Sequence, residues 1–209
     1  MVKEKVLKSK DRSLVGDIDM DFIGSKTERN VLAAFAGESQ ARTRYSFFSS
    51  VARKEGFEQI SAIFEETSEN EKEHAKLFFK HLKGGTAKVE AAYPAGIIGT
   101  TAQNLQAAAE GEKFEWGTLY PSFSKVAEEE GFREVANTFK MIAKVEAYHE
   151  KRYLKLLDNI ISGTVFKKNE PTKWKCINCG YIHESSEAPS FCPVCNHPRS
   201  YFQLCKEDY

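Results

Sequence analysis

Two short motifs each place a glutamate three residues before a histidine. They are Glu71-Lys72-Glu73-His74 and Glu146-Ala147-Tyr148-His149. Residues three apart lie on the same face of an α-helix, so in each motif a carboxylate and an imidazole would point at one spot and could share a metal ion. One such motif is more often a solvated face of a Glu-rich helix, but two in one chain favour a metal site.

The chain contains an internal repeat that includes both motifs. An offset of 75 residues relates 51–57 to 126–132, Glu71 to Glu146, and His74 to His149. Glu38 and Glu112 are related by an offset of only 74, so the stretch between Glu112 and Tyr120 holds one extra residue. We expect this extra residue to form a π-bulge that swings Glu115, which has no counterpart in the first repeat, toward the other glutamates.

Helical periodicity indicates the elements that would carry these residues. Apolar side chains recur at three- and four-residue spacings from residue 26 to about Gly56, and again up to about Gly84. The period is lost over residues 84–100 and then returns as a second pair of helices, of which the last covers about 133–161. Two helix pairs joined by a long crossover predict a four-helix bundle over residues 26–163.

Seven residues of metal-binding types are expected to meet inside this bundle. They are Glu38, Glu71, His74, Glu112, Glu115, Glu146 and His149. Carboxylates buried as bare anions would each cost several kcal/mol, so two cations are expected to neutralise them, and oxygen-rich ligands with two imidazoles suit iron or manganese more than zinc. Tyr45 and Tyr120, which the repeat aligns, would hydrogen-bond the ligand carboxylates or serve as ordinary core aromatics.

Four cysteines near the carboxyl end form two C-x-x-C pairs, separated by 12 residues. Cys176, Cys179, Cys192 and Cys195 would give one closed tetrahedral metal site in a small domain over residues 173–209, after a polar linker at 164–172. The spacing leaves iron and zinc open, and a structural zinc ribbon is the plainer alternative. We expect Cys205 to be structural, and His183 and His197 to be surface residues.

Composition excludes several functional classes. Lys plus Arg and Asp plus Glu both number 30, and this balance gives no general attraction to nucleic acid or an anionic membrane. No apolar run approaches the length of a membrane span. Residues 1–25 are expected to be an extension, partly ordered through Leu14, Ile18 and Phe22. Its start is basic but lacks the apolar region of a secretory signal, so we expect a cytoplasmic protein.

Five segments together resemble the rubrerythrin family over about residues 26–205. They are Phe35-Ala-Gly-Glu-Ser-Gln-Ala-Arg42, Glu71-Lys-Glu-His-Ala75, Gly111-Glu-Lys-Phe-Glu115, Val126-Ala-Glu-Glu-Glu-Gly-Phe132, and the terminal stretch from Cys176 to Phe202. The resemblance implies a mainly α protein, in which a ferritin-like di-iron four-helix bundle precedes a small rubredoxin-like domain with one iron. It also implies a peroxidase that reduces hydrogen peroxide to water in defence against oxidative stress.

The resemblance further implies a role for each ligand in the bundle. Glu71 and Glu146 would bridge the two irons. Glu38 would be a terminal ligand of one iron, and Glu112 with His149 would be terminal ligands of the other.

Glu115 and His74 would, by the same resemblance, be alternative ligands of the first iron that exchange on oxidation and reduction. The electron-transfer iron would be bound by Cys176, Cys179, Cys192 and Cys195.

The expected electron path involves partners. Peroxide takes two electrons, which the thiolate-bound iron would return to the bundle one at a time, after receiving them from an upstream donor such as a reductase or a rubredoxin-like protein. Twelve residues, or about 18 Å of helix, separate His149 from Ile161. We therefore expect the path to cross to a second chain, and the resemblance implies such a head-to-tail homodimer.

Three rival functions use parts of the same pattern. A ferroxidase or iron-storage protein would need the bundle but not the cysteine site. A zinc-ribbon interaction protein with a decayed bundle would lack some ligands, and none is missing. An oxygenase would need a pocket for an organic substrate.

Overall fold

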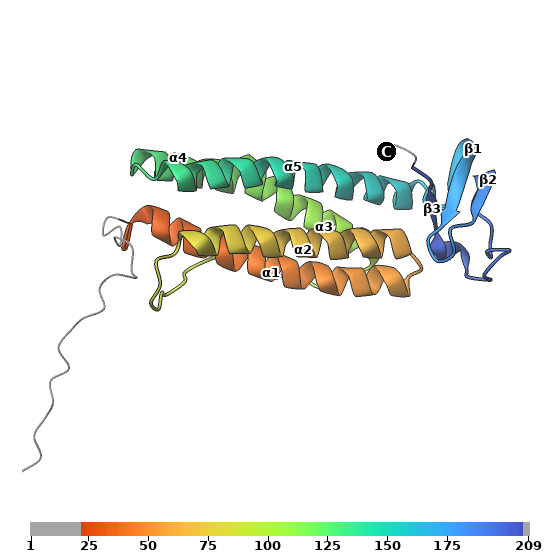
Figure 1. Cartoon of the computed structure of the whole chain (residues 1–209), viewed down its shortest axis with the longest axis horizontal. Helices are drawn as coiled ribbons and strands as arrows, with labels where there is room; N and C mark the ends of the chain where they lie inside the picture. Colours follow the sequence, from red (N-terminus) through yellow and green to blue (C-terminus); the bar gives the residue numbers. More distant parts are fainter. Residues whose placement is uncertain (1–21, 207–209) are drawn as a thin grey trace, which may run out of the picture.

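The computed structural model describes residues 22–206 as a long helical bundle with a small sheet domain at one end (Figure 1). The bundle consists of α1 (Lys26–Lys54), α2 (Glu58–His81), α3 (Thr101–Phe114), the π-helical segment η1 (Glu115–Leu119), α4 (Tyr120–Glu129) and α5 (Arg133–Ile161). The small domain consists of β1 (Lys167–Cys176), β2 (Ile182–Glu187), the 3-10 turn η2 (Arg199–Tyr201) and β3 (Phe202–Leu204). The predicted mainly α fold, with a four-helix bundle and a small C-terminal domain, is confirmed.

The π-bulge predicted from the repeat is present. The segment Glu115–Leu119 is π-helical and lies between α3 and α4, which together form the third helix of the bundle. A π turn accommodates one extra residue without breaking the helix. Pro121 follows it, and because proline has no N–H and its ring crowds the carbonyl four residues back, a wider turn is favoured at this point.

Glycines end the first helix of each pair at equivalent places. Gly56 has φ of 82° and Gly131 has φ of 89°, which is the left-handed conformation that glycine adopts at lowest cost. Each glycine is followed at once by the second helix of its pair. The same turn therefore aligns the two helices of both pairs and brings the repeated ligands to the same height.

The start of α1 is tied to the second helix pair. Ser25 caps the helix by accepting a hydrogen bond from the backbone N–H of Glu28 (2.9 Å). The carboxylate of Glu130, in the turn between α4 and α5, accepts the backbone N–H and the hydroxyl of Thr27 at 2.8 and 2.7 Å. Phe22 is buried against Phe132, with ring centroids 5.3 Å apart. Leu14 and Ile18, expected to help order the extension, lie outside the described residues.

The crossover runs the length of the bundle. Residues 82–100 contain no helix or strand. They lead from the end of α2 to the start of α3, where the backbone N–H of Thr101 donates to Glu55 at the far end of α1 (3.0 Å). Thr100 and Gln103 form a reciprocal capping box that fixes the start of α3. The crossover thus lets the second pair pack across the first, as predicted.

Two apolar clusters fill the bundle on either side of a polar layer. One cluster includes Phe48, Phe64 and Tyr153, and the other includes Phe78 and Phe139. On each of the four helices the predicted metal ligands fall between these clusters along the chain. Apolar burial above and below therefore holds a layer of carboxylates that would not be stable alone.

The small domain is a three-stranded antiparallel sheet in the order β2-β1-β3. Its core contains Trp174 and Phe202 packed with Cys176 and Cys192. Strand β1 begins at Lys167, inside the segment 164–172 that we predicted to be a linker, because its first residues already pair with β2. Within the described residues no helix is long and apolar enough to cross a membrane.

Candidate metal centres

Six of the seven predicted ligands converge in the middle of the bundle. Their side chains form two groups: Glu38, Glu71, His74 and Glu146, and Glu71, Glu112, Glu146 and His149. Within each group the ligand atoms lie within 4.8 Å of one another. The four glutamates are at most 1% exposed, and Glu71 and Glu146 belong to both groups. The geometry is that of two adjacent metal sites sharing two carboxylates.

The two imidazoles occupy equivalent positions in the two groups. His74 Nδ1 lies 2.9 Å from Glu71 Oε2 and 2.9 Å from Glu146 Oε1. His149 Nδ1 lies 2.7 Å from Glu146 Oε2 and 3.3 Å from Glu71 Oε1. Each histidine is thus directed at the same pair of carboxylates from its own side. The third carboxylate of each group is farther away, with Glu38 Oε2 3.8 Å from His74 and Glu112 Oε2 3.8 Å from His149.

The donor atoms of this cluster fit metal ions better than they fit one another. Within the described residues, several buried atoms make at most a charge contact across the cluster and no well-aligned hydrogen bond: Glu38 Oε2, Glu71 Oε1, Glu112 Oε2, both carboxylate oxygens of Glu146, and His149 Nδ1. Leaving such atoms buried and unpaired costs about 1–3 kcal/mol each, more when they are charged. Cations placed among them would satisfy these lone pairs and neutralise the carboxylates together.

Two tyrosines hold the outer oxygens of the ligand carboxylates. Tyr45 Oη donates a hydrogen bond to Glu112 Oε1 at 2.6 Å, and Tyr120 Oη donates one to Glu38 Oε1. Both tyrosines are 1% exposed. Of the two alternatives that the sequence left open for these tyrosines, the structure therefore shows the hydrogen bond to a ligand carboxylate.

Replacing either tyrosine with phenylalanine is expected to weaken the metal-loaded bundle. Tyr45→Phe would leave Glu112 Oε1 buried without a donor, and Tyr120→Phe would do the same to Glu38. We expect a loss of about 1–2 kcal/mol in urea unfolding and about 10- to 100-fold faster release of iron to a chelator. Tyr148→Phe, at a position 58% exposed, is the control. If all three variants unfold and release iron alike, the two tyrosines do not support the ligand carboxylates.

Glu115 is the predicted ligand that lies outside both groups. It sits on the π-helical segment, half-buried, while His74 faces Glu38 across the first group. The neighbouring Trp116 was not singled out by sequence reasoning. Its indole N–H donates to Glu150 Oε2 at 2.7 Å and so pins the π-helical segment to α5 beside His149. The sequence indicated a role for Trp116 only through its position between Glu112 and Tyr120, in the stretch that holds the extra residue.

The four cysteines form a second cluster in the small domain. All four sulfurs lie within 4.8 Å of one another, with Cys176 and Cys195 3.7 Å apart and Cys179 and Cys192 3.5 Å apart. A tetrahedral site with metal–sulfur bonds of about 2.3 Å has edges of about 3.8 Å, so the spacing fits one thiolate-bound ion. All five cysteines of the chain are free thiols, and Cys205 is not in the cluster.

Local turns shape both cysteine pairs. The N–H of Gly180 donates to the carbonyl of Cys176, and the N–H of Asn196 donates to the carbonyl of Cys192, both at 2.9 Å. Gly180 and Asn196 have φ of 80° and 58°, the left-handed conformation that these two residue types tolerate. A backbone hydrogen bond from His197 is the largest cause that lowers the pKa of Cys195, to about 6. This thiolate is thus available to a metal at neutral pH.

His183 and His197 belong to neither cluster. The ring of His183 lies against Tyr181, and the ring of His197 lies against Tyr201 at 4.5 Å between centroids.

Comparison with known proteins agrees with both centres. Residues 29–157 match the family described as Rubrerythrin, and residues 174–203 match the family described as Rubrerythrin, rubredoxin-like domain. The chain belongs to the rubrerythrin family. It is 59% identical to the rubrerythrin of Porphyromonas gingivalis, over 92% of this chain and 96% of that protein. It is 54% identical to the rubrerythrin of Nitratidesulfovibrio vulgaris, over 87% of this chain and 95% of that protein.

A solved structure is similar to this chain over nearly its whole length. A nigerythrin in its fully reduced, all-ferrous state superimposes with a TM-score of 0.55 at 29% identity, covering 94% of this chain and 100% of that chain. The bundle cluster of this rubrerythrin family member is accordingly a di-iron carboxylate site. The cysteine cluster is a rubredoxin-like one-iron site, which decides between the iron and zinc that the cysteine spacing had left open.

Burial and mutual repulsion perturb the glutamates of the metal-free di-iron site. Burial first, and then the charges of Glu146 and Glu71, raise the pKa of Glu38 well above its usual value. Burial and the same two neighbours raise the pKa of Glu112 in the same way. Burial also acts to raise the pKa of Glu71, but hydrogen bonds from His149 and His74 outweigh it and lower the pKa to about 2. The shared carboxylate of Glu71 is thus more readily ionised than those of Glu38 and Glu112.

The two histidines respond in the opposite sense. Burial alone would lower the pKa of His149, but its contacts with Glu112, Glu146 and Glu71 raise it to about 12. Burial is likewise outweighed at His74, where Glu146 and Glu71 raise the pKa to about 10. In the metal-free bundle at pH 7 both imidazoles therefore carry a proton in the place where a metal would bind.

Loading ferrous iron into the metal-free bundle at pH 7 is expected to release protons. Each imidazole must lose a proton to offer a lone pair, and any proton held by Glu38 or Glu112 must also leave, so we expect about two to four protons per chain. Calorimetric titration in two buffers with different ionisation enthalpies measures this number. The protein used should already hold iron at its four cysteines. If the heat of iron binding is the same in both buffers, no protons are released, and the histidines of the metal-free site are not protonated as described.

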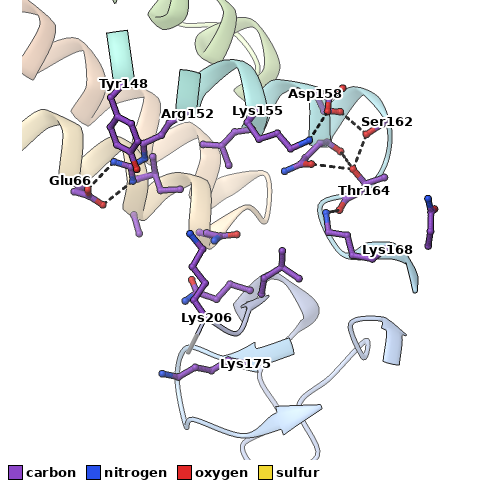
Figure 2. A pocket seen from close by; sticks show the side chains of 18 residues that line it. Glu66, Tyr148, Arg152, Lys155, Asp158, Ser162, Thr164, Lys168, Lys175 and Lys206 are labelled. Atoms are coloured by element: carbon purple, nitrogen blue, oxygen red, sulfur yellow. Dashed lines mark hydrogen bonds and ion pairs between the residues drawn. The ribbon is translucent and has the colours of Figure 1, made fainter. Parts of the chain in front are cut away.

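A separate hollow lies between the bundle and the small domain (Figure 2). It has a volume of about 850 Å³ and is lined by residues of α2, α5, β1 and β3. Arg152 forms two bonds to Glu66, at 2.8 and 3.0 Å, and Lys155 binds Asp158 at 3.0 Å. No predicted metal ligand lines this hollow, so it belongs to the junction of the two domains and not to either metal site.

Proposed function

We propose that this protein is a peroxidase that reduces hydrogen peroxide to water at the di-iron site, with electrons relayed through the Fe(Cys)4 centre. The observation that carries the proposal is the pairing, in one chain, of two buried metal sites that share Glu71 and Glu146 with a separate four-thiolate site. A two-metal site suits a two-electron reaction, and a four-thiolate site suits the transfer of single electrons. We assign the protein to defence against oxidative stress in the cytoplasm.

The reaction balances as H₂O₂ + 2 H⁺ + 2 e⁻ → 2 H₂O. The iron pair, when bound and ferrous, supplies both electrons together, so the O–O bond is cleaved without release of a radical. The protein's own part is to hold the pair and to keep out bulk water. Glu71 and Glu146 tie the two sites together, and Tyr45 and Tyr120 fix the outer carboxylates. The apolar clusters above and below the layer exclude solvent.

We also propose that the ligands have the roles implied by the family resemblance. Glu71 and Glu146 would hold both irons, Glu38 would hold the first iron, and Glu112 with His149 would hold the second. Glu115 and His74 would be alternative ligands of the first iron. The position of His74 among Glu38, Glu71 and Glu146, with Glu115 outside the group, favours His74 as the ligand in the conformation described here.

We also propose a head-to-tail homodimer, in which the cysteine site of one chain faces the di-iron site of the other. The proposal is supported by the length of helix that follows His149 before the small domain begins. This helix, about 18 Å long, separates the two metal sites within one chain. An upstream reductase or a rubredoxin-like protein supplies the electrons. Sedimentation of the iron-loaded protein is expected to give a dimer, and a fully active monomer would exclude this arrangement.

Anaerobic stopped-flow spectroscopy tests the proposed function. Fully reduced, iron-loaded protein is mixed with hydrogen peroxide, and we expect rapid oxidation of the di-iron site followed by growth of the oxidised thiolate–iron band. If dioxygen reacts quickly and peroxide slowly, the protein is a ferroxidase instead. If the thiolate–iron band never grows, the cysteine site is structural and the electron relay is wrong.

A further inference from the structure

A second cavity, of about 770 Å³, lies between the crossover and the outer faces of α1 and α3. The crossover contributes residues 90–94 and Gly96 to its wall. Alanines, glycines and phenylalanines make up much of the rest, including Phe114 and Phe123. The cavity is therefore mainly apolar, in contrast to the charged hollow between the domains.

The floor of this cavity is made of small residues at one-turn spacing. Ala33 and Gly37 contribute from α1, and Ala107 and Gly111 contribute from α3. A Cβ added to Gly37 would meet no atom within 4 Å, and one added to Gly111 would meet only Arg44 Nη2, at 3.6 Å. A glycine inside a helix costs about 1 kcal/mol relative to alanine. Since close packing does not explain these glycines, their effect is to leave open space.

The inner end of the cavity reaches the di-iron site. Glu115 and Tyr120 both line it, and Tyr120 Oη is hydrogen-bonded to the ligand carboxylate of Glu38. Arg44 lines the same cavity, and its Nε is buried without a hydrogen-bond partner among the described residues. A molecule in the cavity would thus meet mainly apolar walls, with Glu115, Tyr120 and Arg44 among the polar groups of the lining. The lining also includes the polar side chains of Arg29, Asn30, Glu90 and Glu110.

The cavity is far larger than hydrogen peroxide needs. A water molecule occupies about 30 Å³ in the liquid, and hydrogen peroxide is only slightly larger. Cavities of about 300–1,000 Å³ are those in which proteins bind organic molecules, and apolar walls favour an organic group by removing it from water. The size and polarity therefore suit a molecule with an apolar body and one polar, reactive end.

We propose that the cavity admits organic hydroperoxides, with the apolar group over Ala33, Gly37 and Ala107 and the O–O bond directed at the di-iron site. This inference rests on the proposed peroxidase function and extends its substrate class. The reaction is ROOH + 2 H⁺ + 2 e⁻ → ROH + H₂O. The O–O bond breaks, the two ferrous ions are oxidised to ferric, and the protons come from solvent.

The test compares two peroxides on the reduced, iron-loaded protein. Stopped-flow rate constants for di-iron oxidation are measured with cumene hydroperoxide and with hydrogen peroxide. Ala107→Phe narrows the cavity, so we expect its rate constant for cumene hydroperoxide to fall at least about 10-fold relative to that for hydrogen peroxide. Ala62→Phe makes the same change in the hollow between the domains and is expected to leave both rate constants unchanged.

A binding measurement tests the cavity apart from catalysis. Calorimetric titration of the metal-free protein with 2-phenyl-2-propanol, the alcohol that cumene hydroperoxide yields, is expected to show saturable binding. We expect Ala107→Phe to weaken this binding at least about 10-fold and Ala62→Phe to leave it intact. Ala33→Leu, on the opposite wall, replaces Ala107→Phe if that variant does not fold.

The outcomes separate the two claims. Fast reaction with hydrogen peroxide but not with cumene hydroperoxide would overturn this inference and leave the proposed function standing. A reaction with cumene hydroperoxide that neither cavity variant slows, or no binding of the alcohol, would also overturn it. Failure of both peroxides would overturn the peroxidase function itself.

Discussion

Glu146→Leu is expected to empty the bundle of iron and leave the iron of the cysteine site in place. Glu146 belongs to both ligand groups, and both of its carboxylate oxygens are buried. Its loss removes one ligand from each metal at once, so neither site keeps enough oxygen donors to hold its ion. We expect iron to fall from about three atoms per chain to about one, and peroxide turnover to fall at least about 1,000-fold.

The same substitution is expected to destabilise the metal-free protein as well. Protonated His74 and His149 lie 2.9 and 2.7 Å from Glu146, and removing one partner of a buried ion pair costs about 3–5 kcal/mol. The loss of stability should be larger in the iron-loaded protein, because the binding energy of the two iron ions is lost in addition. A merely structural glutamate would show the same loss in both.

Iron analysis and urea unfolding with and without iron measure these effects. Glu73→Leu is the matched control, because Glu73 is on the same bundle but exposed and paired with Lys76. We expect it to change stability by less than about 0.5 kcal/mol and to leave the iron content unchanged. Retention of about three irons in Glu146→Leu would show that Glu146 is not a shared ligand.

The helical framework could be predicted because its signals are local and periodic. The observed start and end of α5, Arg133 and Ile161, are those expected from the apolar pattern. The π-helical segment was predictable for a different reason: comparing offsets of 74 and 75 counts residues, and one extra residue in an unbroken helix must be accommodated in a wider turn. The cysteine cluster was predictable because each C-x-x-C pair is closed by its own turn, at Gly180 and Asn196.

Side-chain direction could not be predicted at the same level. The spacing of Glu71 and His74 predicts a shared face, and the structure places both in one group. The π-bulge likewise predicts that Glu115 turns toward the other glutamates, and burial with the charges of Glu112 and Glu146 does raise its pKa. Its carboxylate nevertheless lies outside both ligand groups, at the wall of the cavity. The offset count locates the insertion but carries no information on which rotamer the inserted carboxylate adopts.

Contacts between distant segments could not be predicted from the sequence either. The bond from Trp116 to Glu150 joins residues 34 apart on different helices. The apolar cavity depends on the path of residues 90–96, which have no period from which a path could be read. The sequence points to no residues that would line an organic pocket, because the walls of this cavity come from α1, the crossover and the third helix of the bundle, which only the fold brings together.

Cys192→Ser is expected to abolish turnover while leaving a single round of peroxide reduction intact. Cys192 is buried in the small domain, whose apolar core is small, so the bound iron supplies much of its folding energy. Loss of one thiolate should release this iron and unfold the sheet. The di-iron site lies in the separate bundle and should keep its two irons.

Two rates distinguish this outcome from general damage. The first oxidation of the chemically reduced protein by hydrogen peroxide should stay within about twofold of the wild-type rate, because it needs only the electrons already in the bundle. Steady-state turnover with an external electron donor should fall at least about 100-fold, since the route that returns electrons is gone. Cys205→Ser makes the same change at a cysteine outside the cluster and should affect neither rate. If Cys192→Ser keeps full turnover, electrons enter the bundle by another route, and the four-thiolate site has a structural role alone.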